Sequence, residues 1–274
     1  MRLAWLTDIH LNFLSPQELD VVIPALRRRE ADVYLVTGDI GEADSLSDYL
    51  ERLAQEFDKP VYYVLGNHDY YRGSIESVRE KMLQLSLRLP ALCFLTQAGI
   101  QKLTDSTCLI GHDGWPDGRF GDFENSQVLL NDFLLIRDFR RPSSNLNRLD
   151  PEVKYYWLSV MQRLADESAR SIDRLLKHAL AEYPKVLVAT HVPPFREASL
   201  FNGKISHDHF QPFFASRVMG EILLSHADAN PNAAITVYCG HTHGAGEFSP
   251  MPNLRVVVGG AEYGRPEVQR LIEI

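Results

Sequence analysis

Residues 61–69 read VYYVLGNHD, so that an apolar, β-forming run leads directly into a glycine and three polar side chains. The same succession of a strand-like run and a polar cluster occurs at four other places in the chain. The clusters are Asp8 and His10 after LAWLT (3–7), Asp39 after VYLVT (33–37), His191 after VLVAT (186–190), and His241 and His243 after ITVYC (235–239). Carboxylate, amide and imidazole groups at strand ends predict a metal site at one edge of a sheet, with enough ligands for two ions.

The order of elements along the chain predicts an α/β fold. Strands are expected at 2–7, 32–37 and 60–65, with helices between them, the first of which begins at the capping sequence SPQE (15–18). A strand at about 107–110, a long helix from Pro151 to about Tyr183 and short strands over the last forty residues follow. Alternating strands and helices are typical of a mainly parallel sheet, and such a sheet binds its ligands at the carboxyl ends of its strands.

We expect residues 1–274 to form a single domain, because no repeat, low-complexity tract or linker divides the chain. Two irregular stretches, at about 112–149 and 192–210, interrupt the regular alternation. Long loops inside a compact domain are usually functional, so these two insertions are expected to form the substrate pocket. The candidates for substrate contact within them are His112, Trp115, Arg119, Arg137 and His207.

Composition argues against several classes of protein. With 28 Lys+Arg and 36 Asp+Glu the net charge is −8, which disfavours a broad nucleic-acid-binding surface. The 3 cysteines form no CxxC pair, which indicates a reducing compartment. No apolar run approaches the roughly 20 residues of a membrane span, and the N-terminus has no signal-peptide pattern. We therefore expect a cytoplasmic protein that has no contact with a membrane.

The types and spacing of the polar residues suit metal coordination. Residues two apart in an extended chain lie on the same face, so Asp8 with His10, and His241 with His243, can each reach one ion. The carboxylate of Asp39 has two oxygens and can bridge two cations. Nitrogen and oxygen ligands without thiolate favour Mn, Fe, Zn or Co over a structural Cys-type zinc site.

The polar clusters form an ordered set of motifs: Asp8-x-His10, Gly38-Asp39, Gly66-Asn67-His68-Asp69, His191 and Gly240-His241-x-His243. In this order and at these spacings, from residue 8 to residue 243, the chain resembles the calcineurin-like metallophosphoesterase superfamily. The resemblance implies a four-layer αββα sandwich, in which two facing mixed β-sheets are flanked by helices. It also implies two bound metal ions, for which Mn or Fe is favoured and Zn or Co is the alternative.

The resemblance further assigns a role to each motif residue. Asp8, His10 and His243 would hold the first metal, Asn67, His191 and His241 the second, and Asp39 would bridge the two. His68 would contact the substrate phosphate or protonate the leaving oxygen, oriented by Asp69. The implied reaction is that of a phosphoric ester hydrolase (EC 3.1 class), with in-line attack by a metal-bound hydroxide.

Residues between the motifs separate this chain from two branches of the superfamily. Protein Ser/Thr phosphatases carry GDxxDRG and RGNHE, whereas here Asp39 is followed by IGEAD (40–44) and Leu65 precedes Gly66, so both arginines of those motifs are missing. Purple acid phosphatases need a tyrosine where Glu42 stands. We therefore expect the substrate to be a small anionic phosphoester, in particular a small phosphodiester or related organophosphate.

Three other functions are consistent with parts of the sequence. A DNA or RNA phosphodiesterase is suggested by the basic run Arg137, Arg140, Arg141 and Arg148, although the net acidity disfavours nucleic acid. A phosphomonoesterase would use the same ligands. A non-catalytic protein-binding scaffold is the least favoured alternative, because every expected ligand position is filled.

Overall fold

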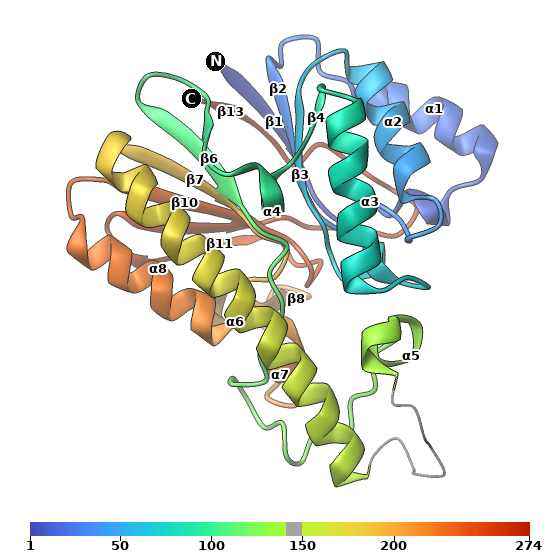
Figure 1. Ribbon diagram of the computed structural model, residues 1–274, viewed down its shortest axis with the longest axis vertical. Coiled ribbons are helices and arrows are strands. Elements are labelled where there is room, and N and C mark those ends of the chain that lie inside the picture. Colours follow the sequence, from blue (N-terminus) through green and yellow to red (C-terminus); the bar gives the residue numbers. More distant parts are fainter. Residues whose placement is uncertain (141–149) are drawn as a thin grey trace.

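Two β-sheets packed face to face form the centre of the molecule in the computed structural model, which describes residues 1–140 and 150–274. Helices cover the outer face of each sheet (Figure 1). They are α1 (Pro16–Leu26), α2 (Leu46–Phe57) and α3 (Ile75–Arg88) on one sheet, and α6 (Pro151–Glu182) and α8 (Arg217–Ala229) on the other. The predicted four-layer α/β arrangement is thus confirmed.

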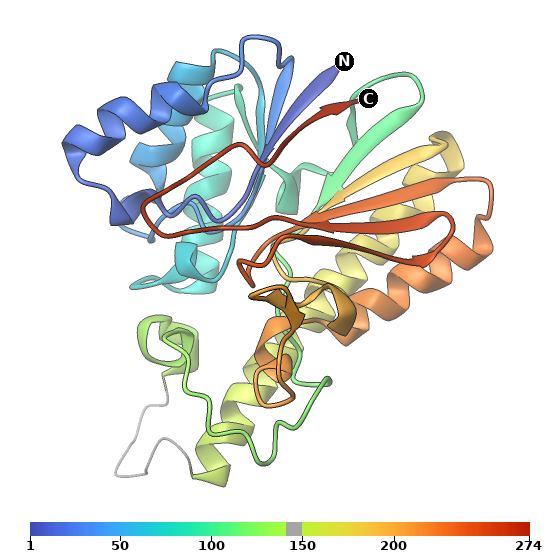
Figure 2. The ribbon, with the colours of Figure 1, turned by 180° about the vertical axis from the view of Figure 1, so that it is seen from behind.

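The first sheet contains five strands, and four of them are parallel. In spatial order the strands are β13 (Arg270–Glu273), β1 (Arg2–Leu6), β2 (Val33–Thr37), β3 (Val61–Val64) and β4 (Leu92–Phe94). The antiparallel strand is β13, which brings the C-terminus of the chain beside the N-terminus (Figure 2). The first connection contains the predicted capping box, in which the Ser15 side chain accepts from the Glu18 amide.

The second sheet has six strands, of which the four central ones are parallel and both edge strands antiparallel. In spatial order the strands are β11 (Gly246–Met251), β12 (Leu254–Val258), β10 (Ala234–Cys239), β7 (Lys185–Ala189), β6 (Thr107–Gly111) and β5 (Gln101–Lys102). The sequence did not predict β4, β5 or the intervening α4 (Leu95–Ala98). Elements of two to four residues are too short to show a period.

Alternate residues of each strand fill two different layers of the core. Leu3 and Trp5 of β1 face the second sheet, where Trp5 contacts Tyr238 of β10 at 5.0 Å between ring centroids. Ala4 and Leu6 of the same strand pack on the other side, among buried residues of the helices. Because both faces of the central strands are buried, these strands are apolar throughout, which explains their clear signal in the sequence.

The two insertions contain short elements gathered at one end of the sheets (Figures 1 and 2). These are α5 (Asp132–Leu135) and the hairpin of β8 (Leu200–Phe201) and β9 (Lys204–Ile205), and α7 (Gln211–Phe214) follows the second insertion; the described residues also contain four 3₁₀ turns. These turns are η1 (Leu11–Phe13), η2 (His68–Tyr70), η3 (Arg137–Phe139) and η4 (Arg196–Ala198). Arg141 and Arg148 lie outside the described residues. Within 1–140 and 150–274, no helix has the length and apolar character needed to cross a bilayer.

Candidate metal centre

The seven predicted metal ligands meet where strands of both sheets end. β1, β2 and β3 of the first sheet lead to Asp8, His10, Asp39 and Asn67, and β7 and β10 of the second lead to His191, His241 and His243. All but His241 and His243 are buried. The carboxyl edge of both sheets is therefore one continuous site.

The backbone at these strand ends adopts a conformation that is uncommon for residues other than glycine. The φ angles are +48° at Asp8, +39° at His10, +52° at Asp39, +71° at His241 and +58° at His243. Each such residue costs of the order of 1–3 kcal/mol, and such strain is typical of functional sites. The extended backbone predicted for 8–10 and 241–243 is thus not observed. The side chains converge because the chain curls through left-handed turns.

Four of the ligands form a compact cluster, which we call the first ligand group. One ligand atom from each of Asp8, His10, Asp39 and His243 lies within 4.8 Å of the others. The Nε2 atoms of His10 and His243 are 3.2 Å apart, and His243 Nε2 is 3.6 Å from an Asp8 carboxylate oxygen. Nitrogen and oxygen donors this close, in a buried site, are an arrangement that a divalent cation fits.

A second ligand group lies beside the first and contains Asn67, His191 and His241. The His191 Nδ1 lies 2.9 Å from the Thr37 carbonyl and the His241 Nε2 lies 2.9 Å from the Phe213 carbonyl, so each of these nitrogens carries its ring's proton. The other two ring nitrogens, His191 Nε2 and His241 Nδ1, then face each other at 3.3 Å, and both lie within 3.1 Å of the Asn67 Oδ1.

An amide oxygen and two ring nitrogens that converge in this way need a positive charge among them, which a proton on His191 Nε2 supplies in the metal-free protein and a bound cation would supply in its place. The backbone carbonyls that fix the two imidazole tautomers are the partners commonly found behind metal-ligating histidines. The geometry of these residues therefore fits a second metal ion.

The electrostatics of the combined cluster also require positive charge. Burial and the neighbouring Asp39 raise the pKa of Asp8, so the two carboxylates disfavour one another's charge. Burial alone would lower the pKa of His191, but the adjacent Asp39, with help from Asp8, outweighs it and raises this pKa to about 10. Burial lowers the pKa of His10 and of His241 to about 3, which keeps both rings neutral and able to bind metal.

His68 lies next to the ligand groups without belonging to either. Its backbone amide donates to Asp39 Oδ1 at 2.9 Å, while its ring Nε2 lies 4.0 Å from Asp39 Oδ2. The ring stacks on Tyr71 at 4.3 Å between centroids and is 16% exposed. It can therefore meet a substrate bound over the metal ligands.

Asp69 has a different position from the one predicted. One carboxylate oxygen accepts from the amides of Ile40 and Gly41, and the other accepts from the amide of Gly66, each at 2.8 Å. None of these contacts involves the His68 ring. Asp69 instead ties together the loops that follow β2 and β3, and thereby holds Asp39 and Asn67 near each other.

Two side chains that the sequence did not indicate, Asp132 and Tyr71, support Asn67 from outside the second ligand group. The carboxyl oxygen Oδ1 of Asp132, at the start of α5, accepts from Asn67 Nδ2 at 2.8 Å and from the Tyr71 hydroxyl at 2.7 Å. Asp132 is only 3% exposed. It orients the Asn67 amide so that the oxygen faces the two histidines. No sequence signal points to Asp132, because it is 65 residues away from Asn67, in an irregular insertion.

The candidates for substrate contact lie elsewhere in the described chain. His112 is buried, and burial lowers its pKa to about 4. Trp115 packs between Tyr70 and Phe139 in the core, and Arg119 pairs with Asp117 and Asp166. Arg137 is in η3, and the His207 ring stacks on His209 at 5.1 Å between centroids. None of these five residues lines the pocket over the metal ligands, which is described next.

A pocket of about 300 Å³ opens directly over the ligand groups, and we call it the metal-site pocket. Its floor contains Asp39, Asn67, His241 and His243. The rest of its lining consists of His68, Tyr71, Leu130, Asn131, Asp132, Phe201, Phe214, Thr242 and Tyr263. Residues of both insertions contribute to this lining, namely Leu130, Asn131, Asp132 and Phe201.

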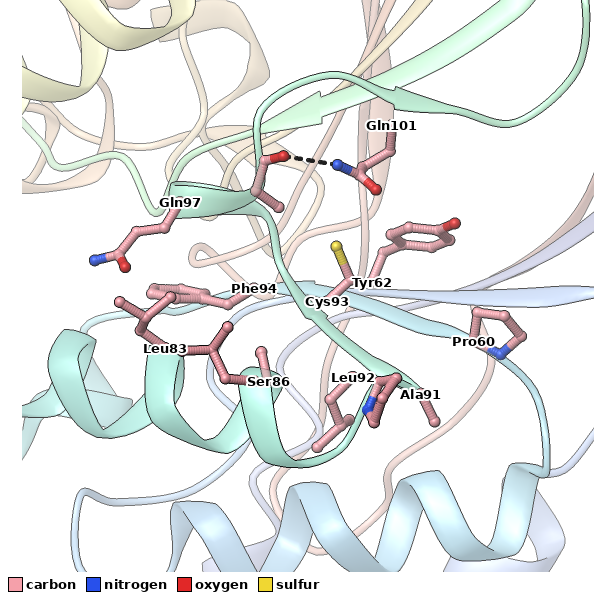
Figure 3. A pocket seen from close by; sticks show the side chains of 13 residues that line it. Pro60, Tyr62, Leu83, Ser86, Ala91, Leu92, Cys93, Phe94, Gln97 and Gln101 are labelled. Atoms are coloured by element: carbon pink, nitrogen blue, oxygen red, sulfur yellow. Dashed lines mark hydrogen bonds between the residues drawn. The ribbon is translucent and has the colours of Figure 1, made fainter.

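A larger pocket, of about 410 Å³, lies between α3, β4 and β5 (Figure 3). Its lining is apolar apart from a few side chains, which include Tyr62, Cys93 and Gln101. Burial raises the pKa of the Cys93 thiol to about 11, so this thiol is protonated at neutral pH and is a poor nucleophile. The chemistry of the site therefore belongs to the smaller metal-site pocket.

Comparison with known proteins agrees with this geometry. Residues 1–245 match the sequence profile of the family described as Calcineurin-like phosphoesterase, and the chain belongs to this family. Uncharacterized protein L509 of Acanthamoeba polyphaga mimivirus is 21% identical over 260 residues, which cover 90% of this chain and 86% of that protein. The uncharacterized metallophosphoesterase Cj0846 of Campylobacter jejuni is 32% identical over 78 residues, or 27% of this chain and 21% of that protein.

Solved structures share the fold. The phosphopantetheinyl hydrolase PptH of Mycobacterium tuberculosis superposes with a TM-score of 0.65 at 15% identity, over 94% of this chain and 89% of that one. A dimetal phosphatase of Danio rerio superposes with a TM-score of 0.55 at 14% identity, over 95% and 87% of the two chains. At these identities the likeness concerns the fold, while the site has to be argued from its own residues.

Proposed function

We propose that this protein is a dinuclear metal-dependent hydrolase of a small phosphodiester or related organophosphate. The observation that carries the proposal is the convergence of an amide oxygen and two imidazole nitrogens, from Asn67, His191 and His241, beside the first ligand group. Asp39 lies between the groups, since one of its oxygens is 3.7 Å from His10 Nε2 and the other is 3.4 Å from His191 Nε2. Mn or Fe suits these ligands, and Zn or Co is the alternative.

When bound, the two ions would supply Lewis acidity and an activated water, which is the chemistry of two-metal phosphoesterases. The phosphate would lie over the two ligand groups, and the pocket presents the His68 ring beside them. Hydrolysis forms one P–O bond from the water oxygen and breaks the P–O bond to the leaving group. The leaving oxygen needs a proton, and the His68 ring at the pocket surface is placed to donate it.

The test uses the full chain, stripped of metal and reloaded with Mn²⁺, Fe²⁺, Zn²⁺ or Co²⁺, with bis(4-nitrophenyl) phosphate as substrate. Asp39→Ala should lose bound metal and hydrolysis together. His68→Ala should retain both ions and slow hydrolysis by about 10²–10⁴-fold for leaving groups of high pKa, and less for 4-nitrophenol. His178→Ala, an exposed histidine on α6, is the matched control and should behave as the wild type.

Several outcomes would decide against the proposal. If the protein hydrolyses no phosphoester with any of the four metals, the proposed phosphoesterase function is excluded. Equal slowing of His68→Ala across leaving groups would remove the acid role of His68. Preference for 4-nitrophenyl phosphate over the diester would indicate a phosphomonoesterase, and hydrolysis of DNA or RNA in preference to small diesters would indicate a nuclease.

A further inference from the structure

The walls of the metal-site pocket are aromatic on both sides of the ligands. On the side of the first ligand group, the Tyr263 ring is 4.6 Å from the His10 ring and 5.0 Å from the His243 ring, and Phe13 packs on Tyr263 at 4.6 Å. On the side of the second, Phe214 meets His241 edge-on at 5.6 Å between centroids.

Three aromatic side chains in or beside this pocket are exposed to solvent. Tyr263 is 48% exposed and Phe201, on the β8–β9 hairpin, is 56% exposed, although both line the pocket. Phe13 beside Tyr263 is also exposed. Exposed aromatic side chains that gather at the mouth of a pocket are typical of a binding site, whereas scattered ones are not.

The charges of the residues that line the pocket also disfavour a second anionic group on the substrate. Among the described residues that line the pocket there is no lysine or arginine, and the side chains away from the metal ligands include the carboxyl group of Asp132. Lys204, which pairs with Phe201 across the hairpin, is exposed and does not line the pocket. One phosphate can be neutralised at the ligand groups, but a second anionic group would find a carboxyl and no described cation.

The position of His68 indicates which part of the substrate meets the aromatic wall. Its ring lies 4.3 Å from Tyr71 and 6.4 Å from Tyr263, measured between centroids. Because Tyr71 covers one face of the His68 ring, a leaving oxygen within reach of His68 places its organic group on the side of Tyr263, at the mouth of the pocket that Phe201 also lines. The burial of a flat ring there would add aromatic contacts that an alkyl group lacks.

We propose that the substrate of this site is a phosphoester whose organic group is uncharged and aromatic, bound against Tyr263 and Phe201, and that the site selects against a second anionic group. This inference rests on the proposed phosphoesterase function and adds the class of group that the pocket accepts.

The first test measures binding and does not depend on turnover. The Mn²⁺-loaded protein is titrated calorimetrically with methylphosphonate, phenylphosphonate and 4-carboxyphenylphosphonate, whose P–C bonds are not hydrolysed. Phenylphosphonate should bind about tenfold more tightly than methylphosphonate, because ring stacking and burial contribute more than 1 kcal/mol. The added carboxylate should abolish this gain.

Variants assign the effect to the aromatic wall. Tyr263→Ala and Phe201→Ala should each reduce the ratio of phenylphosphonate affinity to methylphosphonate affinity, with methylphosphonate titrated against each variant as its own reference. Tyr155→Ala is the matched control, because Tyr155 on α6 is 49% exposed but does not line the pocket. This control should keep the full preference.

A pair of substrates extends the test to hydrolysis. Thymidine 5′-(4-nitrophenyl phosphate) and its 3′-phosphorylated form share one leaving group and differ by a single phosphate. We expect kcat/KM to be lower for the phosphorylated form. Equal or tighter binding of 4-carboxyphenylphosphonate, or no preference for phenylphosphonate, overturns the inference while leaving intact a phosphoesterase that cleaves bis(4-nitrophenyl) phosphate. A protein that neither retains metal nor cleaves that diester overturns both.

Discussion

Replacing Asp132 by alanine should weaken the second metal site, although Asp132 itself is placed to touch no metal. Its carboxyl oxygen is the partner of Asn67 Nδ2, at 2.8 Å, and so determines which end of the amide faces the two histidines. Without Asp132 the amide is free to rotate. Its NH₂ group would then lie about where Oδ1 is now, within 3.1 Å of His191 Nε2 and His241 Nδ1, and could donate to both.

The magnitude follows from these contacts. The rotated amide replaces a cation as the partner of two acceptors, and two hydrogen bonds at about 1 kcal/mol each correspond to roughly a thirtyfold loss of metal affinity. This is within the 10–100-fold range typical when an outer partner of a metal ligand is removed. The first ligand group, which does not include Asn67, should keep its affinity.

The assay is metal content after equilibrium dialysis in metal buffers, with the melting temperature as a check on folding. Asp132→Ala should hold one ion tightly and the second weakly. Two variants serve as controls: Asp132→Asn retains an acceptor for Nδ2, and Tyr71→Phe removes the other donor to Asp132 together with the hydroxyl that Nδ2 reaches at 3.5 Å. Both should stay near wild type. Two ions bound to Asp132→Ala with unchanged affinity would refute the role of the amide orientation.

Three further predictions concern stability and the first ligand group. In the metal-free protein, the pKa of His191 is raised from 6.5 to about 10, so its stabilising contribution is complete below pH 6.5 and is lost as the pH rises toward 10, which urea unfolding would measure. Arg79→Leu should cost about 3 kcal/mol, because it removes the buried partner of the Asp113 carboxylate. Gly240→Ala should lose the first metal, since a Cβ there would lie 1.9 Å from Asp8 Oδ2.

Each of these has a contrary outcome. A metal-free protein whose stability is constant or rises between pH 6.5 and 10 would contradict the assignment of His191. Arg217→Leu, in an exposed ion pair on α8, is the control for Arg79 and should change stability little. Normal metal content in Gly240→Ala would mean that the turn adapts without moving Asp8.

The sequence was sufficient for the longer strands and for the polar clusters at their ends. Strands such as β1 and β7 are buried on both faces, so their apolar runs are unbroken and end sharply at a polar residue. The residue types indicate which side chains can bind metal, and the order of the motifs along the chain limits which of them can form one site. These features are local, which is why His191 and Asp39 could be recognised without coordinates.

The walls of the pocket could not be predicted in the same way. Tyr263, Phe201 and Asp132 reach the site from irregular segments with no period, and each is chosen by tertiary packing rather than by neighbours in sequence. The arginines and histidines of the insertions were proposed as substrate contacts on the basis of residue type alone. Arg119 instead satisfies buried Asp117, and Asp69 satisfies backbone amides rather than orienting His68.

The division of the ligands between two sheets links metal supply to the integrity of the fold. The first sheet and its loops provide Asp8, His10, Asp39 and Asn67, and the second provides the remaining histidines. Ions held by both halves would act as crosslinks that exist only while the halves remain docked. By mass action, each tenfold rise in free metal above the dissociation constant would add about 1.4 kcal/mol per ion to the free energy of unfolding. Thermal denaturation would thereby report on metal availability.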